Sequence, residues 1–315
     1  MSAVAGDHVP RRSQPVRLIA VDMDGTLLDP NDEVSAATVD AIAAARRAGI
    51  PVVPVTGRPE RLVWDKAAKA GLGPLGVGGN GALLLDLVAG DVLVRHGFDG
   101  TAASRVVELL RREVPGICLA ADVGSLFFYE RGTLDGLHLV ERPGRLAVDD
   151  LGPTVAGGCL KLVARRPELT SIELAGLVSP LLRHGLPYDL EPAPRPTEGG
   201  DADQPSAEQA AGLNDSHPDD LAEVTASDVQ WVDIGPPGLT KATGLALLCG
   251  RLGIDLREVA AVGDHYNDLP MLRAVGHPYA MGNALPEVKA AAGRVLPTNA
   301  EDGVAALIRE VLAGH

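Results

Sequence analysis

The chain has 315 residues, enough for two compact domains with a sizeable core. Its formal net charge is −14, and no Lys/Arg cluster resembles a nucleic-acid footprint, so we expect no nucleic-acid partner. No apolar run approaches the roughly 20 residues that cross a bilayer, which argues against a membrane partner. Three scattered cysteines without paired metal spacing favour a reduced setting and predict a cytoplasmic protein.

A pair of acids follows the first apolar run. Residues 1–15 have no signal-peptide core and are expected to form a flexible tail, whereas residues 16–21 predict a short buried strand. Asp22 and Asp24 come directly after it, at the strand end where open α/β sheets place their ligands. Strand alternation would direct both carboxylates to the same side.

Two anions held so close repel each other unless a cation or a shared proton intervenes. Their hard oxygen ligands favour Mg²⁺ as that cation. For an isolated Asp-x-Asp, a pair of solvated loop acids is the ordinary alternative. The apolar strand before the acids and the Gly-Thr after them favour the site instead.

A second apolar run, residues 50–55, ends in Thr56, Gly57 and Arg58 and follows a helical stretch over 35–49. The resulting βαβ arrangement would bring Thr56 beside the first acid pair. A threonine hydroxyl can donate a hydrogen bond to a phosphoryl oxygen. A turn and helix cap is the structural alternative, because a proline follows at residue 59.

The last two motifs lie near the C-terminus. Lys241 opens a helical pattern over 240–253, and the apolar run 259–263 is followed by Asp264. Asp264 would supply a third oxygen donor for one hard cation. Asp268 sits four residues later at a helix start, where it could cap the helix.

Taken in order, these motifs resemble those of the haloacid dehalogenase-like superfamily of phosphohydrolases. Gly79-Asn80-Gly81-Ala82 and the segment from Ala280 to Val304 resemble its Cof-like subfamily, although the resemblance thins out between about 100 and 228. One departure is Ala242, where the relatives usually carry Gly after the lysine.

The resemblance implies a role for each matching residue. Asp22 would be the nucleophile and Asp24 the acid and base, with Thr56 and Lys241 completing the catalytic set. Asp268 would orient Lys241 or a metal-bound water. The expected phosphate-binding residues are Thr56, Gly57, Arg58, Asn80, Lys241 and Asn267, and the expected metal ligands are Asp22, Asp24 through its backbone carbonyl, and Asp264.

The 185 residues between Thr56 and Lys241 exceed what the next βα units require. We therefore expect an α/β fold, with a Rossmann-like, mainly parallel core over 16–82 and 233–315 and an inserted α+β cap over 83–232. An acidic, Pro- and Gly-rich segment near 191–220 predicts a disordered insertion. Because the cap joins the core through two adjacent connections, a hinge motion is expected.

Further elements are predicted within the insertion. The pattern indicates a hairpin over 82–96 and a helix over 101–114 with Thr101 as its N-cap. The remaining expected elements are strands over 117–121, 125–130, 159–164, 221–225 and 230–234, the last two leading back to the core, and a helix over 169–184.

These features predict a Mg²⁺-dependent phosphatase that acts on a small phosphorylated metabolite, a sugar phosphate or a phosphorylated cofactor, through an aspartyl-phosphate. Asp24 argues against a dehalogenase, since the resemblance implies its absence there. A phosphosugar mutase is the first alternative and would need cap arginines such as Arg165, Arg166 or Arg183. A non-catalytic sensor of phosphorylated metabolites is the second. The substrate, the oligomeric state, the role of the insertion and the orientation of His265 and Tyr266 stay open.

Overall fold

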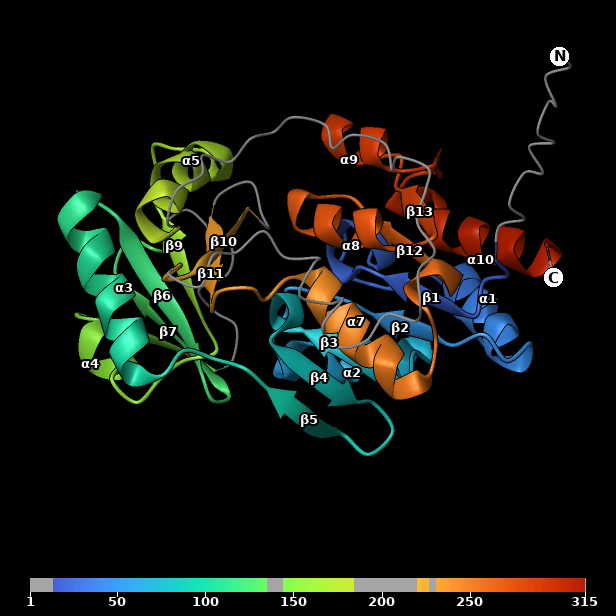
Figure 1. Ribbon diagram of the computed structural model, residues 1–315, viewed down its shortest axis with the longest axis horizontal. Coiled ribbons are helices and arrows are strands. Elements are labelled where there is room, and N and C mark those ends of the chain that lie inside the picture. The colour runs from blue at the N-terminus through green and yellow to red at the C-terminus, as the bar shows by residue number, and fades with distance from the viewer. Residues whose placement is uncertain (1–13, 135–143, 184–219, 227–230, 315) are drawn as a thin grey trace, which may run out of the picture.

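The computed structural model describes residues 14–134, 144–183, 220–226 and 231–314. Two bodies lie next to each other, a larger one that carries α1 and α10 and a smaller one that carries α3 and α5 (Figure 1). The expected tail, up to residue 13, and the acidic insertion, up to residue 219, lie outside the described residues.

The larger body is built on a parallel sheet of five strands in the order β14-β13-β12-β1-β2. Strands β1, β2 and β12 are buried along their whole length, as expected where helices cover both faces of a parallel sheet. The strand bounds are β1 Leu18–Val21, β2 Val52–Pro54, β12 Val259–Gly263, β13 His277–Ala280 and β14 Arg294–Val295. The helices are α1 Ala36–Arg47, α2 Trp64–Ala70, α7 Lys241–Leu252, α8 Leu269–Ala274, α9 Pro286–Ala291 and α10 Gly303–Ala313.

Register decides where the first and last motifs meet. Val21 pairs with Val262, so β1 and β12 end at the same edge of the sheet and Asp22 and Asp264 follow there. A capping residue sets the start of α7, because Thr240 Oγ1 accepts a hydrogen bond from the backbone N–H of Thr243. Lys241 is therefore the first residue of that helix.

The expected hairpin is confirmed, but it belongs to the larger body. Strands β4 (Leu83–Asp86) and β5 (Asp91–Arg95) pair antiparallel and extend β3 (Leu75–Gly78) into a three-stranded sheet. A bridge between Val55 and Val77 connects this sheet to the region of β2, and α7 packs against β3 and β4. Residues 83–95, which the prediction assigned to the cap, therefore pair with β3 of the larger body.

The smaller body holds a six-stranded sheet in the order β10-β11-β9-β6-β7-β8, antiparallel except for the β7–β8 pair. Its α3 and α4 cover the side that faces away from the larger body (Figure 1). The strands are β6 Cys118–Val123, β7 Leu126–Glu130, β8 Arg145–Val148, β9 Lys161–Arg165, β10 Glu223–Ala226 and β11 Val232–Gly235. The helices are α3 Gly100–Glu113, α4 Gly152–Val155 and α5 Ser171–Leu182.

Three details of this body differ from expectation. Asp99, not Thr101, caps α3, because its carboxylate accepts from the backbone N–H of Ala102 at 2.8 Å. Strand β8 and helix α4 were not predicted. Strand β11 pairs with β9 and β10, so the expected return to the core at residue 233 falls within a strand of the smaller body.

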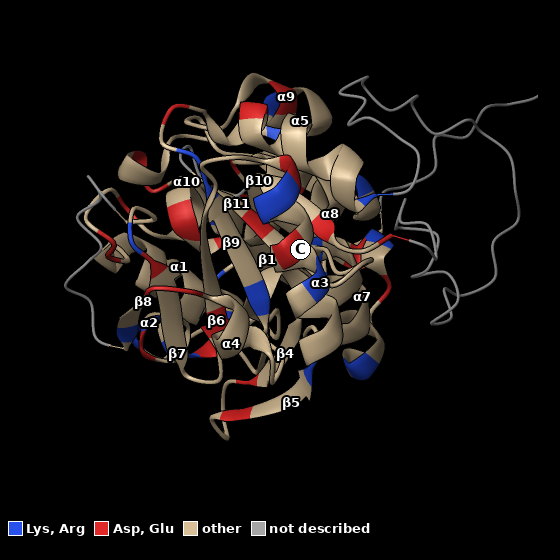
Figure 2. Cartoon of the chain, turned by 90° about the vertical axis from the view of Figure 1, so that its left-hand side faces the viewer, with Lys and Arg blue, Asp and Glu red and all other residues tan. Residues whose placement is uncertain are grey.

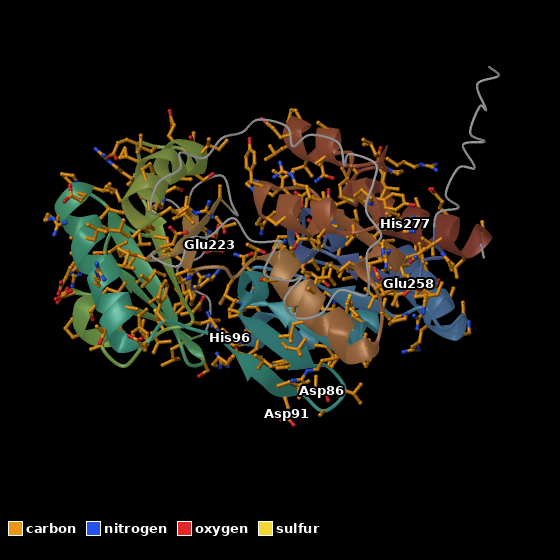
Figure 3. All side chains as sticks on the ribbon, in the orientation of Figure 1. Asp86, Asp91, His96, Glu223, Glu258 and His277 are labelled. Atoms are coloured by element: carbon orange, nitrogen blue, oxygen red, sulfur yellow. The ribbon has the colours of Figure 1, made fainter. Side chains whose placement is uncertain are left out.

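The described part of the chain offers no membrane-spanning helix and no surface of one charge in the view of Figure 2. Of its helices, none combines the length and apolar character that crossing a bilayer demands. Acidic and basic segments are interspersed in the view of Figure 2. Figure 3 marks His96, where the chain leaves β5 toward α3, and Glu223 on β10 of the smaller body.

Candidate active site

A buried lysine and two carboxylates form the centre of the site. Lys241 Nζ lies 2.7 Å from Asp22 Oδ1 and 2.6 Å from Asp268 Oδ1. The side chain of Lys241 has no exposed surface and that of Asp22 is 5% exposed. Because a low-dielectric surrounding strengthens electrostatic interactions, this ammonium group strongly influences any charge that forms on Asp22.

The acids outnumber the cations in this small volume. Burial raises the pKa of Asp22 well above its usual range, and the neighbouring Asp268 raises it further, against the opposing effect of Lys241. Burial alone would lower the pKa of Lys241, but Asp22 and Asp268 outweigh it and hold that pKa above its ordinary value. The site therefore favours the binding of additional positive charge.

Asp264 and Asp268 are fixed by the loop between β12 and α8. Asp264 Oδ1 accepts a hydrogen bond from Thr26 Oγ1 at 2.8 Å. Asp268 Oδ2 accepts from the backbone N–H groups of Asp264 and His265 at 2.9 and 3.0 Å. Burial, together with the charge of Asp268, raises the pKa of Asp264 to about 7.

Oxygen atoms of Asp22, Asp264 and Asp268 come within 4.8 Å of one another, an arrangement that could hold a metal ion. Asp268 uses both carboxylate oxygens for protein partners, whereas Asp22 and Asp264 use one each in the contacts given above. An all-oxygen donor set with excess negative charge fits a hard divalent cation. Asp22 and Asp264 are the better candidates for ligands.

The structure places Asp24 differently from expectation. The chain turns directly after Asp22, with Gly25 at a φ of +72°, so strand alternation does not continue to Asp24. The Asp24 carboxylate is 60% exposed and pairs with Arg58, whose Nε donates to Asp24 Oδ2 at 2.9 Å. Arg58 also pairs with Asp32 at 2.6 Å. The proposed acid–base group thus lies at the surface, held by an arginine from the second motif.

A second group surrounds Thr56, which is fully buried. Its backbone carbonyl accepts from the N–H of Asn80 at 3.0 Å, and its Oγ1 accepts from the N–H of Arg58 at 3.1 Å. Asn267 Nδ2 donates to Asn80 Oδ1 at 3.2 Å. A Cβ atom on Gly57 would lie 3.0 Å from that same oxygen, so Gly57 packs closely against the Asn80 amide. Of the expected phosphate-binding residues, all except Lys241 are therefore connected neighbours through these contacts.

His265 and Tyr266 lie where the two bodies meet. His265 Nδ1 is 2.9 Å from the backbone carbonyl oxygen of Ala226, at the end of β10. Tyr266 is buried, and its ring meets the His265 ring edge-on with 5.3 Å between centroids. Both residues thus contribute to the seam between the bodies.

Charged residues of the smaller body that lie at this seam were not predicted from the sequence. Asp122 pairs with Arg61 at 2.5 Å, and Lys161 pairs with Asp233 at 2.8 Å. The available signal was a charged residue next to or within an apolar run, as for Lys161 after Leu160 and Asp233 between Val232 and Ile234. A charge in a buried strand requires a partner, but the sequence does not identify that partner.

Comparison with known proteins identifies the family. The sequence profile described as haloacid dehalogenase-like hydrolase matches residues 19–132 and 201–308. The chain belongs to the haloacid dehalogenase-like hydrolases. It is an enzyme of the phosphatase type, and the expected Cof-like relationship is confirmed.

Curated relatives match nearly the whole chain. Phosphatase YwpJ of Bacillus subtilis is 28% identical, over 94% of this chain and 100% of its own length. Pyridoxal phosphate phosphatase YbhA of Escherichia coli is 30% identical, over 93% of this chain and 97% of its own. The solved structure of BT1666 from Bacteroides thetaiotaomicron, 24% identical, matches with a TM-score of 0.72 over 98% of this chain and 99% of that one. The likeness in structure confirms the expected fold class.

Proposed function

We propose that this hydrolase is a Mg²⁺-dependent phosphatase that cleaves small phosphate monoesters through an aspartyl-phosphate on Asp22. The observation that carries the proposal is the buried contact of Asp22 with Lys241 beside the carboxylate of Asp264. A nucleophile, a fixed cation and a second acid thereby share one small volume. This grouping suits attack on an anionic phosphoryl centre.

The residues divide the chemistry between them. A carboxylate oxygen of Asp22 attacks phosphorus while the bond from phosphorus to the alcohol oxygen breaks, and Asp24 gives that oxygen a proton. Water then attacks the aspartyl-phosphate, Asp24 takes up its proton, and phosphate leaves with Asp22 restored. Lys241 and the hydroxyl of Thr56 hold the phosphoryl oxygens. Asp22, Asp264 and the backbone carbonyl of Asp24 would hold Mg²⁺, and the bound ion would supply positive charge that offsets the repulsion between nucleophile and substrate.

The identity of the leaving group depends on the smaller body, which we propose as the cap. The relative YbhA is named for pyridoxal phosphate, which supports a phosphorylated cofactor as one substrate class. A sugar phosphate is the other class that the site chemistry allows. Both are small phosphate monoesters.

The alternative of a phosphosugar mutase receives less support. It requires cap cations for a second phosphate, but Arg183 pairs with Glu223 and Arg165 donates to the backbone carbonyl of Thr133 at 3.0 Å. Arg166 Nε lies 3.6 Å from Glu168 Oε2. The three candidate arginines are therefore engaged with protein partners. A non-catalytic sensor is also disfavoured, because the four motifs converge on one site in a family of hydrolases.

Replacing Asp22 with Asn tests the assigned nucleophile. An amide oxygen is a poor nucleophile, so we expect Mg²⁺-dependent hydrolysis of p-nitrophenyl phosphate to fall to the background rate. Asp149→Asn, which changes an acid that is 89% exposed on the smaller body, is the control and should retain wild-type turnover. Full activity of Asp22→Asn would refute the mechanism. A panel of phosphorylated metabolites, assayed for released phosphate and for isomerised sugar phosphate, distinguishes phosphatase from mutase.

A further inference from the structure

Lys161 and Asp233 form a buried ion pair on the cap sheet. Lys161 Nζ lies 2.8 Å from Asp233 Oδ1, and the two side chains are 10% and 5% exposed. They lie on adjacent strands, β9 and β11. Such a pair is weak support for the fold, since taking two charges out of water costs about as much as their attraction returns. The partners across the seam indicate a different role.

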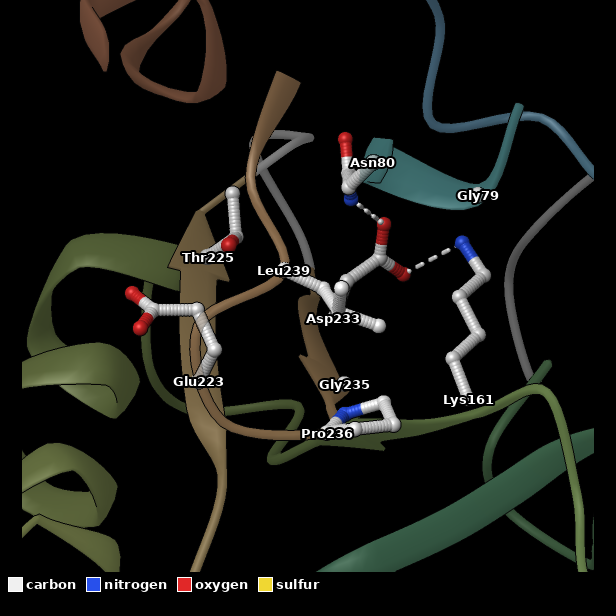
Figure 4. Close-up of a pocket in the computed structure, with 9 residues that line it drawn as sticks. All are labelled: Gly79, Asn80, Lys161, Glu223, Thr225, Asp233, Gly235, Pro236 and Leu239. Atoms are coloured by element: carbon white, nitrogen blue, oxygen red, sulfur yellow. Dashed lines mark hydrogen bonds and ion pairs between the residues drawn. The ribbon is translucent and has the colours of Figure 1, made fainter. Parts of the chain in front are cut away.

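Both members of the pair reach residues of the proposed phosphoryl site. Lys161 Nζ donates a hydrogen bond to the backbone carbonyl of Gly57 at 3.1 Å. Asp233 Oδ2 accepts from Asn80 Nδ2 at 3.0 Å (Figure 4). Asn80 in turn accepts from Asn267 of the fourth motif. Two cap residues thus contact two motifs of the core directly and a third one through Asn80.

The core residues at these contacts need external support. Asn80 has a φ of +54°, a left-handed conformation that persists in a non-glycine residue where its surroundings enforce it. The amide of Asn80 is directed by Asp233 on its nitrogen side and by Asn267 on its oxygen side. Gly57 carries no side chain that could fix its peptide, and Lys161 binds that peptide through its carbonyl oxygen.

We propose that Lys161 and Asp233 are positioning residues that couple the seating of the cap to the geometry of the phosphoryl site. Lys161 orients the Gly57–Arg58 peptide, and Asp233 orients the amide of Asn80. When the cap moves away, both hydrogen bonds are lost together. The phosphate-binding cradle, formed by Thr56, Gly57 and Asn80, then relaxes. This inference rests on the proposed function and adds that catalytic competence requires cap residues that act through groups of the core.

The test compares Lys161→Met with Lys69→Met. Lys69 pairs with Asp65 on the surface at 2.8 Å and provides a matched control in the same side-chain change. We expect Lys161→Met to lower kcat for p-nitrophenyl phosphate by about 10- to 100-fold, because a small misplacement of positioning groups has effects of that size. KM should change far less. Lys161→Arg, which keeps the donor, should recover part of the loss, and Lys69→Met should match the wild type.

A double mutant determines whether Lys161 acts through the cradle. Adding Asn80→Ala to Lys161→Met should reduce kcat by much less than Asn80→Ala reduces it in the wild type, because both changes loosen the same packed unit of Gly57 and Asn80. Losses that multiply independently would overturn the proposal, as would a kcat within twofold of wild type for Lys161→Met. If the uncompensated Asp233 destabilises that variant, Lys161→Met with Asp233→Asn removes both charges and should show the same loss.

Amide hydrogen exchange reports how firmly Gly57 and Asn80 are held, and the measurement does not depend on catalytic activity. In Lys161→Met, amide exchange should become faster in the peptides that contain Gly57 and Asn80 and stay unchanged in the peptide of α10. Unchanged exchange at Gly57 and Asn80 would contradict the proposal whatever the activity. Wild-type protein that hydrolyses no phosphate monoester would instead refute the proposed function. The exchange result therefore tests the positioning role of Lys161 independently of the proposed function.

Discussion

At the scale of single residues, the site depends on an excess of negative charge. Oxygen atoms of Asp22, Asp264 and Asp268 lie within 4.8 Å of one another, and Lys241 pairs with Asp22 and Asp268. Gly25 makes this crowding possible. It adopts a φ of +72° and lets the turn after β1 pass against the carboxylate of Asp264.

Gly25→Ala should therefore damage the site more than backbone strain alone explains. A Cβ atom at this position would lie 2.3 Å from Asp264 Oδ2, so the carboxylate must shift. We expect activity with p-nitrophenyl phosphate to fall by about 10-fold or more, since small displacements of a catalytic group have large effects.

Gly49→Ala is the matched control. Gly49 has a similar φ of +81°, but a Cβ atom there meets nothing within 4 Å. It should lose roughly 1 kcal/mol of stability from the left-handed backbone and keep its activity. Equal losses of activity in the two variants would contradict the steric explanation.

At the scale of secondary-structure elements, α7 connects two parts of the site. Its first residue is Lys241, and its next turn packs against the one-turn helix Gly79–Gly81, which holds Asn80. Gly244 permits this close approach, because a Cβ atom there would lie 2.5 Å from Val77 Cγ1 and 2.7 Å from Gly81 Cα.

Gly244→Ala and Gly250→Ala should have opposite effects on stability. Overpacking at Gly244 should cost about 1–3 kcal/mol and lower kcat, because α7 must move away from Asn80. Gly250 lies in the same helix with open space around it, so alanine should stabilise the protein by about 0.5–1 kcal/mol. Urea unfolding of both variants measures the difference. A neutral Gly244→Ala would show that the contact is not tight.

Much of the element pattern could be predicted, because local periodicity determines which face of a helix or strand is apolar. The apolar runs before Asp22 and Asp264 predicted β1 and β12, and Ser35 and Thr240 begin helices as capping residues. The exposed position of Asp24 could not be predicted, since strand alternation fails in the turn that starts at Met23. The contacts of Lys161 with Asp233 and Gly57 depend on sheet order and cap placement, which local sequence does not encode.

At the scale of the whole molecule, we expect metal binding to raise the thermal stability of the protein, because it neutralises negative charge in the site. The acids of the site repel one another in the absence of a cation, so we expect Mg²⁺ to raise the unfolding temperature and EDTA to reverse the rise. Because the chain carries a net charge of −14, NaCl at matched ionic strength is the necessary control. Differential scanning fluorimetry measures both.

The variant Asp264→Asn removes a proposed ligand and relieves the repulsion at the same time. It should unfold at a higher temperature than the wild type in EDTA and gain little from Mg²⁺. A Mg²⁺ response equal to that of the wild type would place the ion elsewhere on this acidic chain.

The end of α5 and the start of β10 lie next to each other in the smaller body. The backbone N–H of Leu221 donates to the carbonyl of Leu182 at 2.7 Å, and Arg183 pairs with Glu223. The end of α5 and the start of β10 therefore meet at a single clamped point. Because both flanking elements are held together at this point, a reporter domain grafted there would leave the register of β10 unaltered.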